Sequence, residues 1–586
     1  MASSSSTMRL FTIVGCCFAT LGRTHYLSGT SEHLSEGHIY EGESLVWTAC
    51  PDDHAINDDQ QLECSHLLVP MDQFNASNNG LSNEKHFNIS INRLRGRNAT
   101  ANGNINIFLN PGGPGGSATS MVYGLGPQLH SIVGENFNLL GFDPRGVGSS
   151  TPSISDDYWA SGLKYSEACK QAMGEHGEYI NTPQTAAEMN SILNALGQRD
   201  MYYWGFSYGT LLGQTYATMY PERSKRIVVD GVVNQFQWYT SFTYPESTVD
   251  ANNVFHGFLD ECIKAGNKSC PLAQLAETKE ELSEKLISSI SALKEEPASV
   301  YVDSTLVGLV RFRDVWYNTV FRALYSPGRW SHLAATLAPL LRGNATAFFL
   351  EHMVSSGMGP SDSTSVGDYD EGDARILIRL NDGVSGPARS PATRAELIRV
   401  VLAATNNTMF GHKEWNGYCV KQSWAIPHTH SYVPTRGVRT AHPLLILSST
   451  FDPVTPLISA RLANDAFVGS RLVEVRGYGH LSSAAPSDCA VNHVRRYFQE
   501  GFLPENNVVC SPNLPLPYFP AFGGKSAGCG RVGPGSEDGG AVGAVDLFQA
   551  STRWTKTLVL QMPPHHHIKH HPHIKTQRNT AIFIAF

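Results

Sequence analysis

Met201-Tyr202-Tyr203-Trp204-Gly205-Phe206-Ser207-Tyr208-Gly209-Thr210 is the stretch that decides the fold. An apolar, aromatic run typical of a buried strand leads into Gly-x-Ser-x-Gly, and a helix-like run follows as far as Tyr220. The glycines on either side of Ser207 leave room for a sharp strand-to-helix turn, which strains the serine backbone and exposes its hydroxyl. This context predicts a nucleophile elbow with Ser207 as the reacting group.

The same five-residue pattern occurs again at Gly524-Lys525-Ser526-Ala527-Gly528. No strand-like run precedes this second match, and further glycines follow where a helix would have to begin. Because so short a pattern recurs by chance, its structural context has to separate the two matches. We expect the second match to be fortuitous.

Strand-like runs occur on both sides of the elbow, with helical runs between them. These strand-like runs span residues 63–94, 104–109, 137–142, 226–233, 443–448 and 472–475. One intervening helical run, 185–196, has Met189, Ile192 and Leu193 on one face. Strands that alternate with helices predict a mostly parallel sheet with helices on both faces.

The length of 586 residues exceeds one ordinary domain, so we expect a core with an insertion. Between 234 and 442 amphipathic helical segments replace the strand pattern. This predicts a large helical cap inserted between two late strands, with the core divided into 40–233 and 443–516. Residues 517–586 are Gly-rich and then His-rich, and we expect them to be a low-complexity tail without a role, although histidine clusters can bind metal.

The composition excludes several classes of protein. A net charge of −8 and a pI near 6.3 give no electrostatic reason to expect nucleic-acid binding. The apolar fraction of 41% is that of a globular chain, and no run approaches the ~18 apolar residues of a membrane span. We therefore expect neither a nucleic-acid partner nor a membrane partner.

The first 21 residues have the pattern of a secretory signal. Arg9 precedes the apolar run 10–21, and Cys17-Phe18-Ala19 is an acceptable small-x-small cleavage site. Only one basic residue precedes the apolar run, so a buried N-terminal strand remains the alternative. The pattern predicts a secreted, extracellular protein.

The eleven cysteines also bear on whether the protein is secreted. Two would leave with the signal and one lies in the tail, so eight remain, which can form four disulfides in an oxidising compartment. Close spacing suggests three pairs and elimination a fourth: Cys50–Cys64, Cys262–Cys270, Cys489–Cys510 and Cys169–Cys419. Buried free thiols are the alternative.

Glycosylation is permitted, though not required, by acceptor sequences at Asn75, Asn88, Asn98, Asn267, Asn344 and Asn406.

A serine hydroxyl needs a base to remove its proton and a third group to orient that base. Asp452 lies in Ser449-Thr450-Phe451-Asp452-Pro453, just past the strand-like run 443–448. His480 lies in Gly477-Tyr478-Gly479-His480, just past the run 472–475. Loops at the carboxyl edge of a parallel sheet are where such sheets place their sites. The order serine, acid, histidine is that of an α/β-hydrolase triad, so we predict Ser207, Asp452 and His480.

Two other aspartates compete with Asp452. Asp230 follows the strand after the elbow, a position that can also supply the acid. Asp143, in Asp143-Pro144-Arg145-Gly146, is expected to support a turn through an ion pair with Arg145. We expect Asp452 to be the acid.

The segment Asn110-Pro111-Gly112-Gly113-Pro114-Gly115-Gly116-Ser117 follows a short strand and leaves backbone N–H groups unobstructed. Acyl transfer requires such donors to stabilise the oxyanion. We expect one donor from Gly113 or its neighbour, and the other from the N–H of Tyr208. The loop lacks the glycine spacing and the terminal Gly-Lys-Ser of nucleotide-binding loops, so a phosphate role is disfavoured.

Several motifs together resemble one family. NPGGPGGS, FDPRGVGSS, GFSYGT, DGVV, FDPVTP and YGH occur in this order, and the chain resembles the tripeptidyl-aminopeptidase and prolyl-iminopeptidase-like serine peptidases with the α/β-hydrolase fold. The resemblance spans roughly residues 49 to 515 and includes the family's C-terminal module at 489–510. It implies a secreted serine exopeptidase that removes short units from a free N-terminus and uses no metal or cofactor. Carried onto this chain, it implies the same triad; the tail has no counterpart and the cap is where members diverge.

An exopeptidase of this kind needs carboxylates to hold the substrate ammonium. The predicted cap offers Glu246, Asp250, Asp314, Glu351 and Asp370 as candidates, none of which the sequence singles out. An esterase or amidase acting on a small non-peptide acyl compound would use the same triad. A non-catalytic binding protein is the third hypothesis, and it is disfavoured because every catalytic position is present.

Overall fold

The computed structural model describes residues 43–50, 62–74, 86–99, 105–151, 162–355, 371–411, 415–513 and 518–519. The predicted signal, the second Gly-x-Ser-x-Gly match, the histidine-rich stretch and Asp370 lie outside these ranges. Within them, no helix combines the length and apolar character that crossing a bilayer demands.

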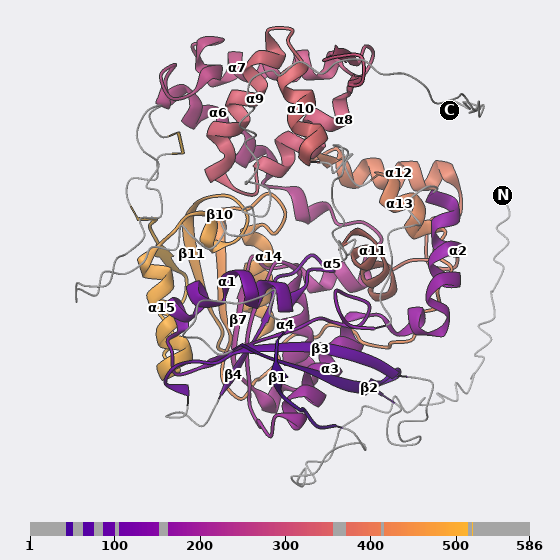
Figure 1. Ribbon diagram of the computed structural model, residues 1–586, viewed down its shortest axis with the longest axis vertical. Coiled ribbons are helices and arrows are strands. Elements are labelled where there is room, and N and C mark those ends of the chain that lie inside the picture. Colours follow the sequence, from indigo (N-terminus) through magenta and orange to yellow (C-terminus); the bar gives the residue numbers. More distant parts are fainter. Residues whose placement is uncertain are drawn as a thin grey trace, which may run out of the picture.

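A ten-stranded sheet forms the centre of the described structure, in the order β1-β2-β3-β5-β4-β6-β7-β10-β11-β12 (Figure 1). Its strands are β1 (Thr48–Ala49), β2 (Leu62–Pro70), β3 (His86–Leu94), β4 (Asn106–Asn110), β5 (Asn138–Phe142), β6 (Met201–Phe206), β7 (Ser224–Asp230), β10 (Leu445–Phe451), β11 (Arg471–Tyr478) and β12 (Val508–Cys510). Pairing is antiparallel from β1 to β5 and parallel from β5 to β12. The predicted mostly parallel sheet is confirmed.

Helices cover both faces of this sheet, because successive side chains of a strand point to opposite faces. Phe108 of β4 packs into one core cluster, whereas its neighbours Ile107 and Leu109 pack into another. The first cluster is closed by α3 (Thr182–Ala195), α4 (Tyr208–Met219) and α14 (Leu457–Ala466), and the second by α1 (Ala118–Val133) and α15 (Asp488–Glu500). The parallel strands are buried on both faces, which accounts for their continuous apolar runs.

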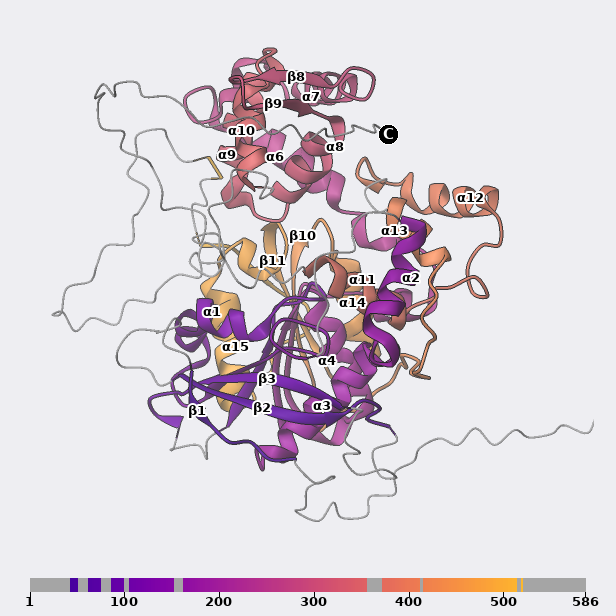
Figure 2. The same ribbon diagram turned by 45° about the vertical axis from the view of Figure 1, so that its right-hand side comes forward.

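The chain between β7 and β10 is mainly helical, as expected, and Figure 2 shows that it falls into two groups. Its elements are α5 (Gln235–Thr240), α6 (Ala251–Ala265), α7 (Lys279–Ala292), β8 (Ala298–Tyr301), β9 (Val307–Val310), α8 (Phe312–Val315), α9 (Trp330–Leu341), α10 (Thr346–Ser355), α11 (Glu371–Asp382), α12 (Arg394–Thr405) and α13 (Trp415–Gln422). The group from α6 to α10, with the hairpin β8–β9, encloses its own apolar cluster around Phe255, Phe258 and Trp330. The group from α11 to α13 lies lower, beside α2 (Gly162–Met173).

Two residues that the sequence analysis assigned to the tail pack against the upper group. Phe519 is buried, 6.0 Å from the ring of Phe258, and the ring of Tyr518 lies 5.0 Å from that of Trp330. Aromatic side chains bury a large apolar area, which explains why this part of the chain is held on the upper group.

Three of the four predicted disulfides are present: Cys50–Cys64, Cys262–Cys270 and Cys489–Cys510. The fourth prediction is wrong, because Cys169 and Cys419 are free. Cys169 on α2 packs into the main core, whereas Cys419 on α13 packs against a separate cluster that contains Leu397 and Val401. Cys169 is thus accommodated as a small apolar side chain of the core rather than as half of a disulfide.

Candidate active site

Ser207 lies between β6 and α4 in the strained turn that the sequence predicts. Its φ of 54° and ψ of −121° are rare for a residue with a side chain. A Cβ atom at Gly205 would lie 2.3 Å from the carbonyl oxygen of Gly209, so the tight turn excludes any side chain there. The Ser207 N–H donates to the carbonyl of Asp230 at 3.0 Å, which ties the turn to the end of β7.

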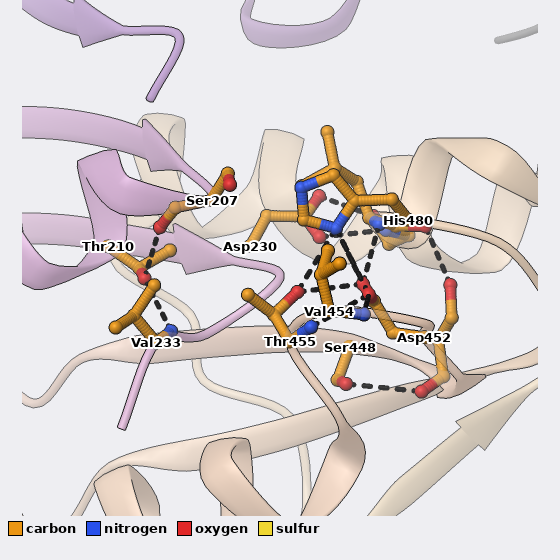
Figure 3. A network of polar contacts seen from close by, with 12 residues as sticks. Ser207, Thr210, Asp230, Val233, Ser448, Asp452, Val454, Thr455 and His480 are labelled. Carbon is orange, nitrogen blue, oxygen red and sulfur yellow. Dashed lines mark hydrogen bonds and ion pairs between the residues drawn. The ribbon is translucent and has the colours of Figure 1, made fainter. Parts of the chain in front are cut away.

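Asp452 and His480 form a hydrogen-bonded pair at the ends of β10 and β11 (Figure 3). The His480 Nδ1 lies 2.9 Å from Asp452 Oδ2. The same carboxylate accepts the N–H groups of Val454 and Thr455 and the hydroxyl of Thr455, at 2.8 to 2.9 Å, and the N–H of Leu481 at 3.0 Å. Burial opposes ionisation of Asp452, but the His480 charge and these hydrogen bonds outweigh it and lower its pKa from its usual value.

His480 is held from its other side as well. The backbone N–H of His480 donates to the backbone carbonyl of Tyr325 at 2.8 Å, and the Tyr325 ring meets the imidazole edge-on at 5.1 Å. In Figure 3 the imidazole lies between Ser207 on one side and Asp452 on the other. No hydrogen bond joins Ser207 Oγ to His480 in this structure, and such contacts often tighten only when substrate is bound.

The structure distinguishes Asp452 from Asp230 and Asp143, the two other aspartates considered for the acid of the triad. Asp230 accepts the N–H and hydroxyl of Ser482 at 2.8 and 2.5 Å and makes no hydrogen bond to His480. Burial raises the pKa of Asp230 to about 6.

Asp143 supports a turn, as expected, but through different partners. It accepts the Ser117 hydroxyl at 2.8 Å and the Ser149 N–H at 2.9 Å. The predicted ion pair between Asp143 and Arg145 is wrong, because the buried Arg145 guanidinium pairs with Glu188 instead, at 2.6 Å.

The glycine-rich loop after β4 lies against the elbow. A Cβ atom on Gly112 would lie 3.0 Å from the backbone nitrogen of Tyr208 and 2.9 Å from Ser207 Cβ, so only glycine permits this approach. The Gly112 N–H is used internally, since it donates to Asn110 Oδ1 at 3.0 Å. Gly113, Ser207 and Tyr208 all line one cavity, which makes the Gly113 N–H the loop donor best placed for an oxyanion.

That cavity has a volume of about 190 Å³ and is walled by both the sheet end and the cap. On the core side it is lined by Val232, Val454 and Thr455 besides the elbow. On the cap side it is lined mainly by neutral polar and aromatic residues: Asn234, Gln237, Trp238, Tyr244, Ser247, Thr248, Phe321, Tyr325, Phe410 and Tyr418.

Of the cap carboxylates named from the sequence, Glu246 is the one whose side chain meets cavity-lining residues. It lies in the short helix Pro245–Thr248 and accepts hydrogen bonds from Asn234 at 3.0 Å, Ser459 at 2.5 Å and Gln237 at 3.5 Å. The other described candidates are bound elsewhere: Asp250 to Asn253, Asp314 to the N–H of Arg311, and Glu351 to Thr336 and His332.

A second group of functional interest was not predicted. The Tyr208 hydroxyl lies 2.5 Å from Thr182 Oγ1, which in turn donates to Asp382 Oδ2 at 2.6 Å. The same carboxylate accepts the Trp238 indole N–H at 2.9 Å. Thr182 and Asp382 are 200 residues apart, so nothing in the local sequence could reveal this contact.

Among the described residues, side chains of the types that bind metals come together at one place. The ligand atoms of Cys489, His493 and Cys510 lie within 4.8 Å of one another. The two sulfurs are joined as a disulfide, so neither is the thiolate that binds a metal.

Comparison with known proteins agrees with this geometry. Residues 105–484 match the family described as the alpha/beta hydrolase fold. The chain is 28% identical to the serine protease Hip1 of Mycobacterium tuberculosis, over 69% of this chain and 80% of that protein. It is 24% identical to the tripeptidyl aminopeptidase of Streptomyces coelicolor, over 80% and 86%, and 27% identical to carboxylesterase B of M. tuberculosis, over 69% and 80%.

Proposed function

The chain belongs to the α/β-hydrolase-fold family and is a serine hydrolase, and from that premise we propose that it is an exopeptidase that releases short units from the free N-terminus of peptides. The hydrogen-bonded pair of Asp452 and His480, beside the strained Ser207, carries the catalytic part of this proposal. Similarity to a serine protease and to a tripeptidyl aminopeptidase supports the peptidase part.

The proposed mechanism follows from the positions of these groups. His480 takes the proton of Ser207 Oγ as that oxygen attacks the scissile carbonyl, and then gives it to the leaving amine. Asp452 keeps the Nδ1 proton directed at itself and stabilises the imidazolium. The N–H groups of Tyr208 and Gly113 stabilise the oxyanion, and water then hydrolyses the acyl-enzyme on Ser207.

Glu246 supports the choice of a free N-terminus. Its carboxylate accepts hydrogen bonds from three neutral side chains of the cavity wall. An anion held in this way directly behind the wall favours a cation in the cavity, and the α-ammonium of a peptide is such a cation. A cavity of about 190 Å³ is small beside the roughly 300–1,000 Å³ of drug-sized ligand sites, which favours a short unit.

A small-molecule esterase or amidase is the second candidate. The similarity to carboxylesterase B favours it, since the same triad and oxyanion donors serve an ester. The two candidates differ in the substrate: a peptide with a free N-terminus brings an ammonium that Glu246 can attract, whereas a small ester or amide brings none.

We also propose that the protein is secreted. The N-terminal signal pattern, three disulfides and exposed acceptor asparagines at 267, 344 and 406 support an oxidising, glycosylating route.

The proposal is tested with paired chromogenic tripeptide amides, one with a free N-terminus and one acetylated, and with simple esters alongside. We expect kcat/KM to be at least tenfold higher for the free amine. Glu246→Gln should remove that preference by slowing the free-amine substrate, because the amide keeps similar contacts but loses the charge.

Glu351→Gln is the matched control, since this cap carboxylate contacts Thr336 and His332 rather than the cavity wall. Ser207→Ala should abolish turnover of every substrate, which excludes a contaminating hydrolase. Equal cleavage of free and acetylated peptides, or hydrolysis of esters alone, would refute the exopeptidase proposal and favour the second candidate.

A further inference from the structure

The charged residues that line the cavity within the described chain are two arginines. Arg375 and Arg379 both belong to α11 and are one helical turn apart, so they share one face of that helix. No carboxylate among the described residues lines the same cavity directly. Two positive charges therefore lie among the otherwise neutral residues on the cap side of the cavity.

Arg379 is held in place by aromatic rings of that wall. Its guanidinium carbon lies 4.7 Å from the ring centroid of Tyr244 and 6.0 Å from that of Trp238. The two rings stack on each other with centroids 5.9 Å apart. A guanidinium packed on aromatic faces keeps its planar array of donors oriented, which reduces the entropy lost when it binds an anion.

A buried lysine lies directly behind the wall. Lys421 is 2% exposed, and its Nζ donates to the Tyr244 hydroxyl at 2.8 Å and to the Phe242 carbonyl at 2.7 Å. Burial, and then the positive charges of Arg379 and Arg389, lower the pKa of Lys421 well below its usual value. Lys421 therefore holds Tyr244, and with it the aromatic wall, by a buried hydrogen bond.

Asp382, at the end of the same helix as the two arginines, is bonded to residues other than these arginines. Its carboxylate accepts hydrogen bonds from Thr182 and Trp238. Burial raises the pKa of Asp382 to about 7.

We propose that Arg375 and Arg379 form an anion subsite of this cavity, which binds a carboxylate carried by the unit that the enzyme releases. This inference rests on the proposed function for the identity of that unit. A guanidinium matches a carboxylate with two parallel N–H donors. Glu246 is bonded to Asn234, Gln237 and Ser459, whereas the two arginines belong to α11, so one unit can present its ammonium to the first and its carboxylate to the second. The preferred substrates are peptides with an acidic residue in the N-terminal unit.

The test compares tripeptide amides in which one position at a time is Glu or Gln, because this pair differs in charge and hardly in shape. At one of the three positions we expect the wild-type enzyme to prefer Glu by about tenfold or more in kcat/KM, an advantage that falls as salt is added. Arg375→Gln and Arg379→Gln should each reduce the preference towards unity. Arg375→Lys should retain part of it.

Arg399→Gln is the matched control, since Arg399 is exposed on α12 and does not line the cavity. Arg375 is also exposed, so its replacement leaves the fold intact even if the Arg379 variant disturbs the aromatic wall. Occupancy is read independently of turnover, from the protection of Ser207 against a fluorophosphonate by the tripeptides Ala-Ala-Glu and Ala-Ala-Gln.

The outcomes separate this inference from the proposed function. Equal rates for Glu and Gln at every position with equal protection, or a Glu preference that survives both arginine variants, overturns the anion subsite whatever the N-terminal preference. A Glu preference that depends on these arginines but is the same for acetylated peptides keeps the subsite and refutes the exopeptidase. Loss of the preference in Arg399→Gln would also overturn the assignment.

Discussion

Three buried aspartates near the elbow have different roles because they have different partners. Asp452 is bonded to an imidazole, Asp230 to the N–H and hydroxyl of Ser482, and Asp143 to the side chains and N–H groups of a turn. The pKa of Asp452 is lowered, whereas burial raises the pKa of Asp143 and Asp230. A carboxylate that must remain charged to stabilise an imidazolium is therefore found at Asp452 alone of the three.

Replacing Asp452 or Asp230 by asparagine tests which of the two is the acid of the triad. Asp452→Asn should lower kcat by on the order of 10³–10⁴, as loss of the acid does in other serine triads, because His480 is left in the wrong tautomer. Asp230→Asn should change kcat by less than about tenfold, since the amide can accept the Ser482 N–H and donate to its hydroxyl. The reverse ranking in steady-state kinetics would make Asp230 the acid.

The stability of Asp230→Asn should also depend on pH in a defined direction. The pKa of Asp230 is raised from 3.8 to about 6 in the fold, so the native state binds more protons than the unfolded state in this interval. The wild-type free energy of unfolding therefore falls, relative to the variant, as pH rises from 4 to 6, by about 3 kcal/mol at most. Urea unfolding at pH 4.5 and 7.5 measures this; a difference that is constant with pH would contradict it.

Helix α11 joins the cap to the proposed catalytic residues through one side chain. Asp382 at its end accepts hydrogen bonds from the N–H and hydroxyl of Thr182, the first residue of α3, and Thr182 contacts the hydroxyl of Tyr208. Tyr208 is the residue whose N–H is the proposed oxyanion donor. The position of α11 is thereby linked to the position of a catalytic donor, as well as to the arginines of the anion subsite.

Thr182→Val removes this link with almost no change of shape. We expect kcat to fall by about tenfold with a smaller change in KM, because Tyr208 loses its orienting partner, and the free energy of unfolding to fall by about 1–3 kcal/mol, because Asp382 loses a buried donor. Thr185→Val is the control, since the Thr185 hydroxyl bonds only to the carbonyl of Asn181 on the same helix. Equal kinetic effects of the two substitutions would show that the link does not act on the donor.

Across the whole molecule, the sheet and the proposed triad were predictable because each depends on short stretches of sequence. The runs at 201–206 and 445–451 are continuous and apolar, and Ser207 and Asp452 directly follow them. The hairpin β8–β9 was missed because its strands have only 4 residues each and lie among helices. The cavity wall was not predictable, because Glu246, Arg375 and Ser459 meet only through the packing of the cap on the core.

Disulfide pairing shows the same limit. Close pairs were found from spacing, since cysteines 8 to 21 residues apart are joined by short loops. The pair Cys169–Cys419 was reached by elimination, which assumes that every cysteine is oxidised, and the structure instead buries Cys169 as an apolar side chain.

The three disulfides stabilise parts of the molecule that lie outside the cavity, so stability and activity should respond separately to reduction. Their loops of 14, 8 and 21 residues should each contribute about 2–4 kcal/mol by restricting the unfolded chain. Full reduction should therefore lower the Tm by on the order of 10 °C, read by calorimetry, while kcat/KM at 25 °C changes little, because none of the six cysteines lines the cavity.

Alkylation of the unreduced, denatured protein should label Cys169 and Cys419 and spare these six. An unchanged Tm after reduction would mean that the pairs do not form in the protein, and loss of activity well below the transition would mean that the cavity depends on them.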